Sequence, residues 1–239
     1  MDTLRQKVQP HAQQQVMVNS FIQSVYNWMA IGLAITGFVA YSVANSEIML
    51  RLIFGNKLVF FGLIIAELVL VYNISARVSS GRMGASTATG LFVLYAALNG
   101  ATLSVIFLAY TASSITSTFF ICAGTFAACS IYGMVTKRDL TSLGGFMMMG
   151  LIGIIIASVI NMFVRSTGMS LIISYIGVLV FVGLTAYDTQ KLKHMALEQP
   201  DGIDSGTVRK GAILGALSLY LDFINLFLML LRIFGGGRD

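Results

Sequence analysis

The sequence contains little charge and almost no proline. Of its 239 residues, 10% are Asp, Glu, Lys or Arg and two are proline, whereas 56% are hydrophobic. A soluble domain carries about 25% charged residues. The shortage of charge therefore excludes a soluble globular protein. It predicts an integral membrane protein with one helical domain, short loops and no soluble module that could hold its own core.

Cysteine and histidine are equally scarce, with two of each. Cys122 and Cys129 lie seven residues apart in one apolar segment, which places them ~10 Å apart along a helix. That separation is too long for a disulfide, so both are expected to be small packing residues. His11 and His194 lie in polar flanks and lack the spacing of metal ligands. No cofactor and no firmly held metal ion is expected.

Long apolar runs dominate the rest of the chain. A helix needs about 20 apolar residues to cross a bilayer. Seven windows of this kind occur, at about 22–46, 56–76, 86–110, 113–135, 142–164, 169–189 and 212–234. They predict an all-α transmembrane domain over residues 22–234. A polar tail (1–21) without a cleavable signal peptide is expected before it, and a short C-terminal tail (235–239) after it.

The basic residues predict the orientation, because cytoplasmic loops are enriched in Lys and Arg. With the N-terminus inside, ten basic residues lie on the inner side and five on the outer side. The inner ten are Arg5, Lys7, Arg77, Arg82, Lys137, Arg138, Lys191, Lys193, Arg209 and Lys210, and the outer five are Arg51, Lys57, Arg165, Arg232 and Arg238. A cytoplasmic N-terminus and a periplasmic C-terminus are predicted. The net charge of +5 then reflects topology, and no nucleic-acid site is inferred from it.

The last apolar window contains a stripe of polar side chains. Residues 217–234, LSLYLDFINLFLMLLRIF, include an aspartate. An Asp at the centre of a membrane helix costs roughly 3 kcal/mol, whereas each Leu, Ile or Phe favours insertion by at most ~0.5 kcal/mol. The stripe recurs at intervals of four, three, four and three residues and consists of Ser218, Asp222, Asn225, Met229 and Arg232. Such a face should meet protein or an aqueous cavity, so this helix is predicted at the centre of the bundle.

Three carboxylates lie in or at the edge of apolar segments: Glu67, Asp188 and Asp222. Intramembrane carboxylates usually face the bundle interior and mark ion or proton pathways. The alternative is that each is neutral or hydrogen-bonded to nearby Ser, Tyr or Asn. Asp188 is followed by Lys191 and Lys193, so it could also be a plain helix-end aspartate. Pairing it with Asp222, about ten residues into its apolar window, requires helix tilt or a deep inner cavity.

A pair of these aspartates would respond to pH. Two carboxylates in a poorly solvated site cannot both ionise cheaply, so the pair would exchange a proton near physiological pH. A protonated pair can tie the last two helices together, whereas a doubly charged pair repels or attracts a cation. Asp188 and Asp222 are therefore predicted as the sensor and gate of a cation pathway. Glu67 and Asn225 are candidates for that pathway, and Arg77 is a candidate counter-charge.

Two segments, GLTAYDTQKLKH and SLYLDFINLFLMLLRIFG, together resemble the signature of the Bax inhibitor family, the transmembrane Bax inhibitor motif proteins. The likeness runs through all seven spans, includes TKRDLTSLGGF before the fifth, and is strongest to a bacterial inner-membrane branch. The resemblance implies a seven-helix fold whose last helix is wrapped by the other six. It also implies pH-sensitive calcium leak, with Asp188 and Asp222 as the sensor. Glu67 matches the family's second-helix glutamate, whereas Arg77 is one position out of register with the family's arginine.

Three functions are compatible with these observations. The first is a passive, pH-gated calcium-permeable channel in the bacterial inner membrane, in which calcium passes near Asp188 and Asp222. The second is a non-conducting regulatory protein that binds a membrane protease or another partner. The third, an intramembrane aspartyl protease, is disfavoured because residues 219–222 read LYLD and lack the GxGD glycines of such enzymes. The expected protein is a monomer in the lipid bilayer and not an enzyme.

Overall fold

The computed structural model describes residues 2–198 and 204–236, with side chains from Val16 onward. Within these residues the chain is helical and has no β-strand. The helices are α1 (Asp2–Ala44), α2 (Glu47–Phe54), α3 (Lys57–Ser79), α4 (Ala85–Leu103), α5 (Ile106–Ala109), α6 (Ala112–Val135), α7 (Thr141–Val164), α8 (Thr167–Leu197) and α9 (Ser205–Phe234). In this part of the chain, seven segments are long and apolar enough to cross a membrane, α4 and α5 together forming one of them. The predicted all-α, seven-span architecture is confirmed.

Short polar residues mark where the helices begin. Ser46, Asn56, Thr111 and Ser166 each accept a hydrogen bond from a backbone N–H in the first turn of α2, α3, α6 and α8, and Asp204 does the same for α9. These caps satisfy N–H groups that have no partner within the helix. Short turns can therefore join neighbouring spans without leaving backbone groups unpaired.

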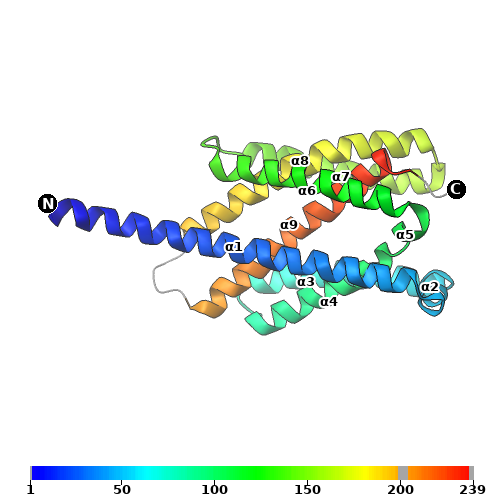
Figure 1. The fold of residues 1–239 in the computed structure, drawn as a ribbon, viewed down its shortest axis with the longest axis horizontal. Helices are drawn as coiled ribbons and strands as arrows, with labels where there is room; N and C mark the ends of the chain where they lie inside the picture. Colours follow the sequence, from blue (N-terminus) through cyan, green and yellow to red (C-terminus); the bar gives the residue numbers. More distant parts are fainter. Residues whose placement is uncertain (1, 199–203, 237–239) are drawn as a thin grey trace.

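The last helix lies in the middle of the bundle. In Figure 1, α9 (orange to red) runs diagonally behind α1, with α3 and α4 below it and α6, α7 and α8 above it. Helices α8, α1, α6, α4 and α3 pack against α9, and α7 packs on α8. In the most apolar stretch of α9, 67% of the residues are buried, against 6% in α3 and 11% in α7. The predicted central position of the last helix is confirmed.

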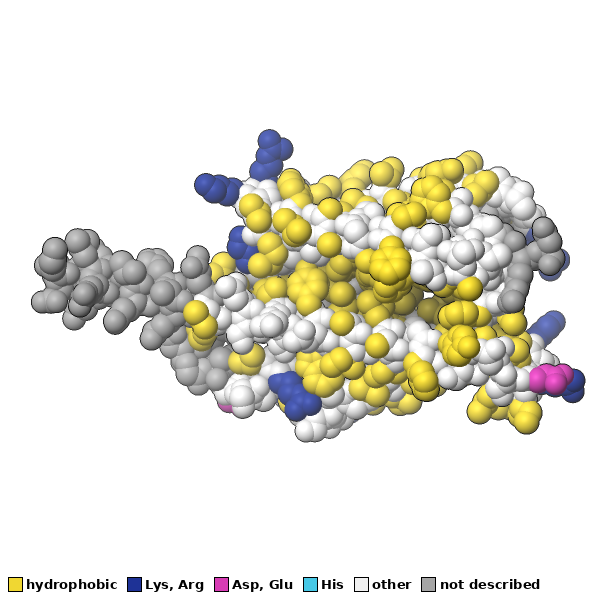
Figure 2. Space-filling view, viewed as in Figure 1, with side chains coloured by type: hydrophobic (Ala, Val, Ile, Leu, Met, Phe, Trp, Pro, Cys, Tyr) yellow, Lys and Arg dark blue, Asp and Glu magenta, His cyan; other side chains and the backbone are white. Residues whose placement is uncertain are grey.

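The side of the bundle is apolar, and its basic residues lie at the two ends (Figure 2). Large hydrophobic side chains on this surface are mostly uncovered: Leu58 is 84% exposed, Phe163 82% and Phe38 73%. Contact with water would make such exposure unfavourable, whereas lipid tails accept it. The surface is therefore that of a protein embedded in a bilayer.

The two ends differ in charge. One end, called the basic end below, holds Arg77, Arg82, Lys137, Arg138, Lys191, Lys193, Arg209 and Lys210. The opposite end, called the far end, holds Arg51, Lys57, Arg165 and Arg232.

Helix α8 is longer than the apolar window that predicted it. Its 31 residues correspond to ~46 Å, compared with about 30 Å of bilayer hydrocarbon. The extension holds the turn between α6 and α7: Gln190 Nε2 donates to the carbonyl oxygen of Arg138 and its Oε1 accepts from Leu140 N, each at 2.8 Å. Lys193 Nζ donates to the carbonyl oxygen of Met134 at 2.7 Å. The predicted sixth span, 169–189, therefore covers only the apolar part of a helix whose polar end packs on a neighbouring turn.

Two glycines allow helices to approach at backbone distance. A Cβ added to Gly133 of α6 would lie 2.3 Å from the carbonyl oxygen of Ala186 in α8. At Gly100 of α4 it would lie 2.6 Å from the carbonyl oxygen of Thr36 in α1. Small residues at such contacts let membrane helices pack closely. Because Ala186 lies two residues before Asp188, the first contact also fixes the position of the aspartate site.

Candidate functional site

Asp188 lies inside α8 and faces α9. The helix continues for nine residues after it, to Leu197, and the side chain is half-buried. Its Oδ2 accepts a hydrogen bond of 2.6 Å from Ser218 Oγ of α9. The alternative of a plain helix-end aspartate is therefore excluded, because α8 extends past its apolar run.

Asp222 is almost fully buried in α9, with 5% of its surface exposed. Its carboxyl group interacts directly with that of Asp188 across the contact between α8 and α9. Its Oδ2 is buried and has no hydrogen-bond partner among the described residues. Burying a polar oxygen without a partner is costly. The structure thus brings the two carboxyl groups together and leaves one oxygen available for a proton or a cation.

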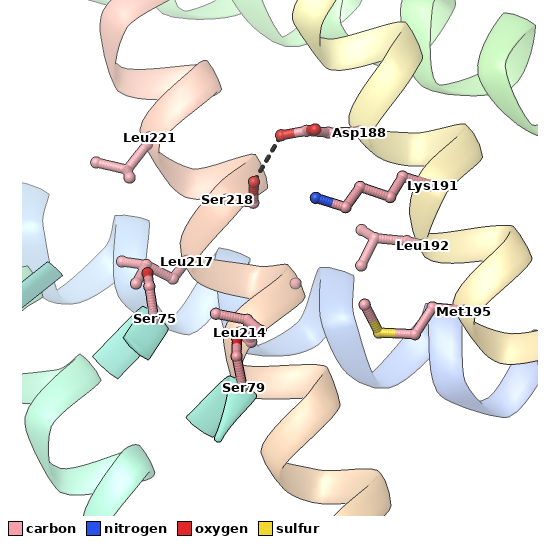
Figure 3. A pocket seen from close by; sticks show the side chains of 11 residues that line it. Ser75, Ser79, Asp188, Lys191, Leu192, Met195, Leu214, Leu217, Ser218 and Leu221 are labelled. Carbon is pink, nitrogen blue, oxygen red and sulfur yellow. Dashed lines mark hydrogen bonds between the residues drawn. The ribbon is translucent and has the colours of Figure 1, made fainter. Parts of the chain in front are cut away.

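A cavity of about 250 Å³ lies between α3, α8 and α9 on the basic-end side of Asp188 (Figure 3). Ser75 and Ser79 of α3 form one wall, and Asp188 with Lys191 of α8 and Ser218 of α9 form the polar part of the other. The cavity carries a cluster of polar side chains on a partly apolar lining and is large enough to hold several water molecules. It supplies the deep inner cavity that pairing of the two aspartates requires.

The cation in this cavity is Lys191 rather than Arg77. The Lys191 side chain points into the cavity (Figure 3), where its charge acts on Asp188. Arg77 is exposed and does not line the cavity, although Ser75 and Ser79 on either side of it do. Positions two residues apart lie on nearly opposite faces of a helix, so Arg77 faces away. Its role as a counter-charge stays a prediction without a contact that supports it.

Glu67 belongs to a different cluster. Its carboxylate accepts hydrogen bonds from Asn99 Nδ2 at 3.2 Å and Thr102 Oγ1 at 2.9 Å, both on α4. Tyr220 of α9 donates from its hydroxyl to Asn99 Oδ1 at 2.9 Å. The Tyr220 hydroxyl also lies 2.7 Å from Thr36 Oγ1 of α1, which donates to the backbone of α4. This Glu67 network joins α1, α3, α4 and α9, and it corresponds to the hydrogen-bonded alternative considered for Glu67.

Asn225 forms no hydrogen bond with the aspartate pair in the described part of the chain. Its Nδ2 donates to the carbonyl oxygen of Leu221, one turn earlier in α9, at 2.8 Å. The side chain lines a second cavity, of about 560 Å³, between α7, α8 and α9 toward the far end. Along α9 the two cavities lie on opposite sides of Asp222, the first reaching Leu221 and the second reaching Asn225.

The aspartate site offers few ligands for a metal ion. Nowhere in the described residues do three or more His, Cys, Asp or Glu side chains gather in a way that could hold one. Asp188, Asp222 and Ser218 supply oxygen atoms, which calcium prefers, but calcium takes six to eight of them. These three side chains alone fall short of a full coordination shell for calcium.

Sequence patterns missed several of the site's residues. Lys191 follows Asp188 by three positions, a helical spacing that indicates a shared face. Asn99 and Tyr220 are polar side chains inside apolar windows, and such residues usually face the bundle interior. Neither pattern identifies the partner on another helix, so the Glu67 network was not predicted.

Comparisons with known proteins agree with this architecture. Residues 18–239 match the family model described as Inhibitor of apoptosis-promoting Bax1. The chain is 53% identical to the inner membrane protein YbhL of Escherichia coli K12 over 231 residues, which cover 97% of this chain and 96% of that protein. It is 45% identical to an uncharacterized protein of Borreliella burgdorferi, covering 95% and 96% of the two chains. An uncharacterized membrane protein of Streptococcus pyogenes serotype M1 is 39% identical, with 94% and 96% covered. This chain therefore belongs to the Bax inhibitor-1 family and is a multi-pass inner membrane protein.

Proposed function

We propose that this protein is a passive, pH-sensitive path for calcium across the inner membrane, with Asp188 and Asp222 as its gate. The observation that carries the proposal is the buried Asp222 Oδ2, which lacks a hydrogen-bond partner among the described residues and lies beside a second carboxyl group. A carboxylate that served only to hold helices together would be expected to have its oxygens satisfied.

The charge state of the pair would change the contact between α8 and α9. With a shared proton, the two carboxyl groups attract each other through a hydrogen bond. Without it they repel each other, and a cation that enters the gap relieves the repulsion. Ser218 donates to Asp188 and adds a hydroxyl oxygen at the same level. The width and the charge of the path at this level would therefore depend on pH.

The cavities on the two sides of Asp222 support a path through this level. The cavity of about 250 Å³ reaches Asp188 from the basic end, and the cavity of about 560 Å³ reaches Asn225 from the far end. Only about one turn of α9 separates Leu221 from Asn225. A short constriction with few oxygen ligands would favour a slow leak over a highly conducting selective pore.

The decisive experiment is calcium entry into dye-loaded proteoliposomes between about pH 5 and pH 8, the range in which a coupled carboxyl pair can exchange a proton. The native protein should give a protein-dependent flux that varies with pH. Asp188→Asn and Asp222→Asn should shift or abolish that variation. Glu198→Gln removes an exposed carboxylate at the basic end and should leave the pH dependence of the flux unchanged.

Two results would contradict the proposal. One is purified, folded native protein that gives no flux above empty liposomes at any pH. The other is a flux whose pH dependence is identical in the native protein and in both aspartate variants. Either result would favour the non-conducting alternative, a regulatory protein that binds a membrane protease or another partner.

The proposal includes an orientation with the basic end in the cytoplasm, which puts the N-terminus inside and the C-terminus in the periplasm. Eight of the Lys and Arg residues in the described spans and turns lie at the basic end and four at the far end. Cytoplasmic ends carry such an excess. Alkaline phosphatase fused to the C-terminus should be active and green fluorescent protein fused there should be dark. The reverse pattern would overturn this orientation.

A further inference from the structure

The larger of the two cavities beside Asp222 is a cleft that changes in polarity along its length. Toward the far end it is lined by Arg232, Asn161 and Ser170, which lie within the last or first turns of α9, α7 and α8. Toward the middle of the bundle it is lined by Leu151 and Phe181, each ~20 Å from the far end of its helix. The cleft therefore has its charged group where the lipid headgroups lie, and its deeper lining is mainly apolar, with Ser158 and Asn225 as polar exceptions.

The cleft opens sideways, toward the lipid. On α7, three side chains that line it are half or more exposed: Ile155 at 53%, Val159 at 50% and Met162 at 63%. Its apolar interior includes Ile173 and Phe181 of α8, both buried. Water in a space bounded by these side chains would lose hydrogen bonds, whereas a hydrocarbon chain would not. The part of the cleft toward the middle of the bundle is therefore suited to an acyl chain.

The far-end part of the cleft carries a positive charge without a counter-charge. The side chains that line the cleft include no Asp or Glu, and Arg232 forms no ion pair with any described residue. Asn161 is already engaged, since its Nδ2 donates to Ser170 Oγ at 2.7 Å and its Oδ1 accepts from Ser166 N at 3.0 Å. The N-terminus of α8 lies at the same end and adds a partial positive charge. Arg232 is thus the group whose donors remain available to an anion.

From this arrangement we propose that the cleft binds one phospholipid of the far-end leaflet. Its acyl chain lies between α7 and α9, and its phosphate accepts hydrogen bonds from the Arg232 guanidinium. A guanidinium matches two phosphate oxygens at once, which favours a phosphate over a neutral headgroup. The cleft and its charge exist whether or not the aspartate pair conducts, so lipid binding can be tested separately from calcium flux. A chain in the cleft would occupy the far-end approach to Asn225, so the bound lipid would compete with the proposed calcium path for this space.

Native mass spectrometry of the protein released from detergent micelles tests the proposal, with phosphatidylglycerol as the probe. The native protein should retain one molecule in preference to further ones. Arg232→Gln should bind it roughly tenfold more weakly, the loss expected for one charge-assisted hydrogen-bonded contact. Arg165→Gln is the matched control, because Arg165 is also an exposed far-end cation but does not line the cleft. It should retain the lipid.

Two further arms identify what is bound. Ser158→Phe fills the middle of the cleft, leaves Arg232 in place, and should also weaken retention. Glycerol 3-phosphate, which has the phosphate but no acyl chain, should not bind. Circular dichroism and gel filtration establish that each variant is folded before it is compared.

Several results would overturn the proposal. The native protein could retain no phosphatidylglycerol, or Arg232→Gln and Arg165→Gln could weaken retention equally, which would indicate a general effect of interfacial charge. Binding of glycerol 3-phosphate alone would point to a headgroup or free-phosphate site without a chain in the cleft. A native dimer that dissociates on Ser158→Phe would show that a second copy covers the cleft instead.

Discussion

Two polar clusters on α9 differ in how completely their hydrogen bonds are satisfied. In the Glu67 network, the carboxylate has two donors, and the Tyr220 hydroxyl donates to Asn99. In the aspartate pair, Ser218 satisfies one oxygen of Asp188 while Asp222 Oδ2 has no partner among the described residues. A satisfied network holds helices in place, whereas an unsatisfied carboxylate keeps its capacity to take up a proton or a cation. The Glu67 network is thus the more completely bonded of the two clusters, and the proposed function rests on the other one.

The largest effect on stability is expected where the satisfied network is broken. Asn99→Ala removes one donor to Glu67 and the acceptor of the Tyr220 hydroxyl, which leaves Glu67 with Thr102 and the Tyr220 hydroxyl with Thr36 as their remaining partners. The free energy of unfolding should fall by about 3 kcal/mol, as measured by circular dichroism in detergent. Asn73→Ala is the control, because the Asn73 side chain bonds only within its own helix, to Val69. Equal losses in the two variants would show that the network has no special role.

A smaller loss is expected where α6 touches α8 behind the aspartate pair. Gly133→Ala places a Cβ 2.3 Å from the carbonyl oxygen of Ala186, so the two helices must separate. Overpacking of this kind should cost roughly 2 kcal/mol in thermal or chemical unfolding. Gly124→Ala in the same helix meets nothing within 4 Å and should be neutral or slightly stabilising. A Gly133→Ala protein as stable as Gly124→Ala would mean that the close contact is absent.

A fourth carboxylate, outside the membrane, extends the comparison to a hydrogen-bonded group in water. Asp204 caps α9 and accepts from Gly206 N, Thr207 N and Thr207 Oγ1. The side-chain and backbone hydrogen bonds from Thr207 and Gly206 lower the pKa of this exposed carboxyl. Because the pKa is lower in the folded state, the cap contributes stability above the unfolded value of about 3.9 and loses it as pH falls below that.

Asp204→Ala should therefore lower the melting temperature slightly at neutral pH, since a helix loses its N-cap. The difference from the native protein should shrink as the pH falls below about 4, where the unfolded carboxyl takes up a proton, and it should be smallest once the pH has also passed the lowered pKa of the native carboxyl. Thermal unfolding of both proteins at several pH values measures this difference in melting temperature. A difference that persists unchanged in acid would assign the effect to packing rather than to the charged cap.

The smallest change in stability is expected at the aspartate pair itself. Asp222→Asn keeps the shape of the side chain, removes a buried charge and adds a donor that faces Asp188. Replacing a buried charged group with a neutral one is often neutral or stabilising, so the free energy of unfolding should stay within ~0.5 kcal/mol of the native value or rise. Circular dichroism under the conditions used for Asn99→Ala allows direct comparison. A loss as large as that of Asn99→Ala would make the pair a structural element and weaken its assignment as a gate.

Apolar length and helical spacing were sufficient to predict the seven spans and the central position of α9, and they selected Asp188 and Asp222, which the structure places side by side. These properties depend on composition and on periodicity within one helix. The length of α8, the Glu67 network and the position of Lys191 were not predicted, because each depends on contacts between helices. Arg77 was a candidate from its distance along α3, but its face of the helix decides its surroundings. The polar tail predicted for residues 1–21 continues as part of α1, which begins at Asp2.

The extension of α8 has a mechanical consequence. Gln190 and Lys193 of this extension form hydrogen bonds with the turn between α6 and α7. These bonds connect α6, α7 and α8 at the basic end. A separation of Asp188 from Asp222 would then move these three helices together against α9, and not α8 alone. If α8 rotates as a rigid helix, its end near Leu197 would move farther than Asp188, because displacement grows with distance from the pivot. The cytoplasmic tip of α8 in the proposed orientation is thus the place where a change at the gate would be most visible from outside the membrane.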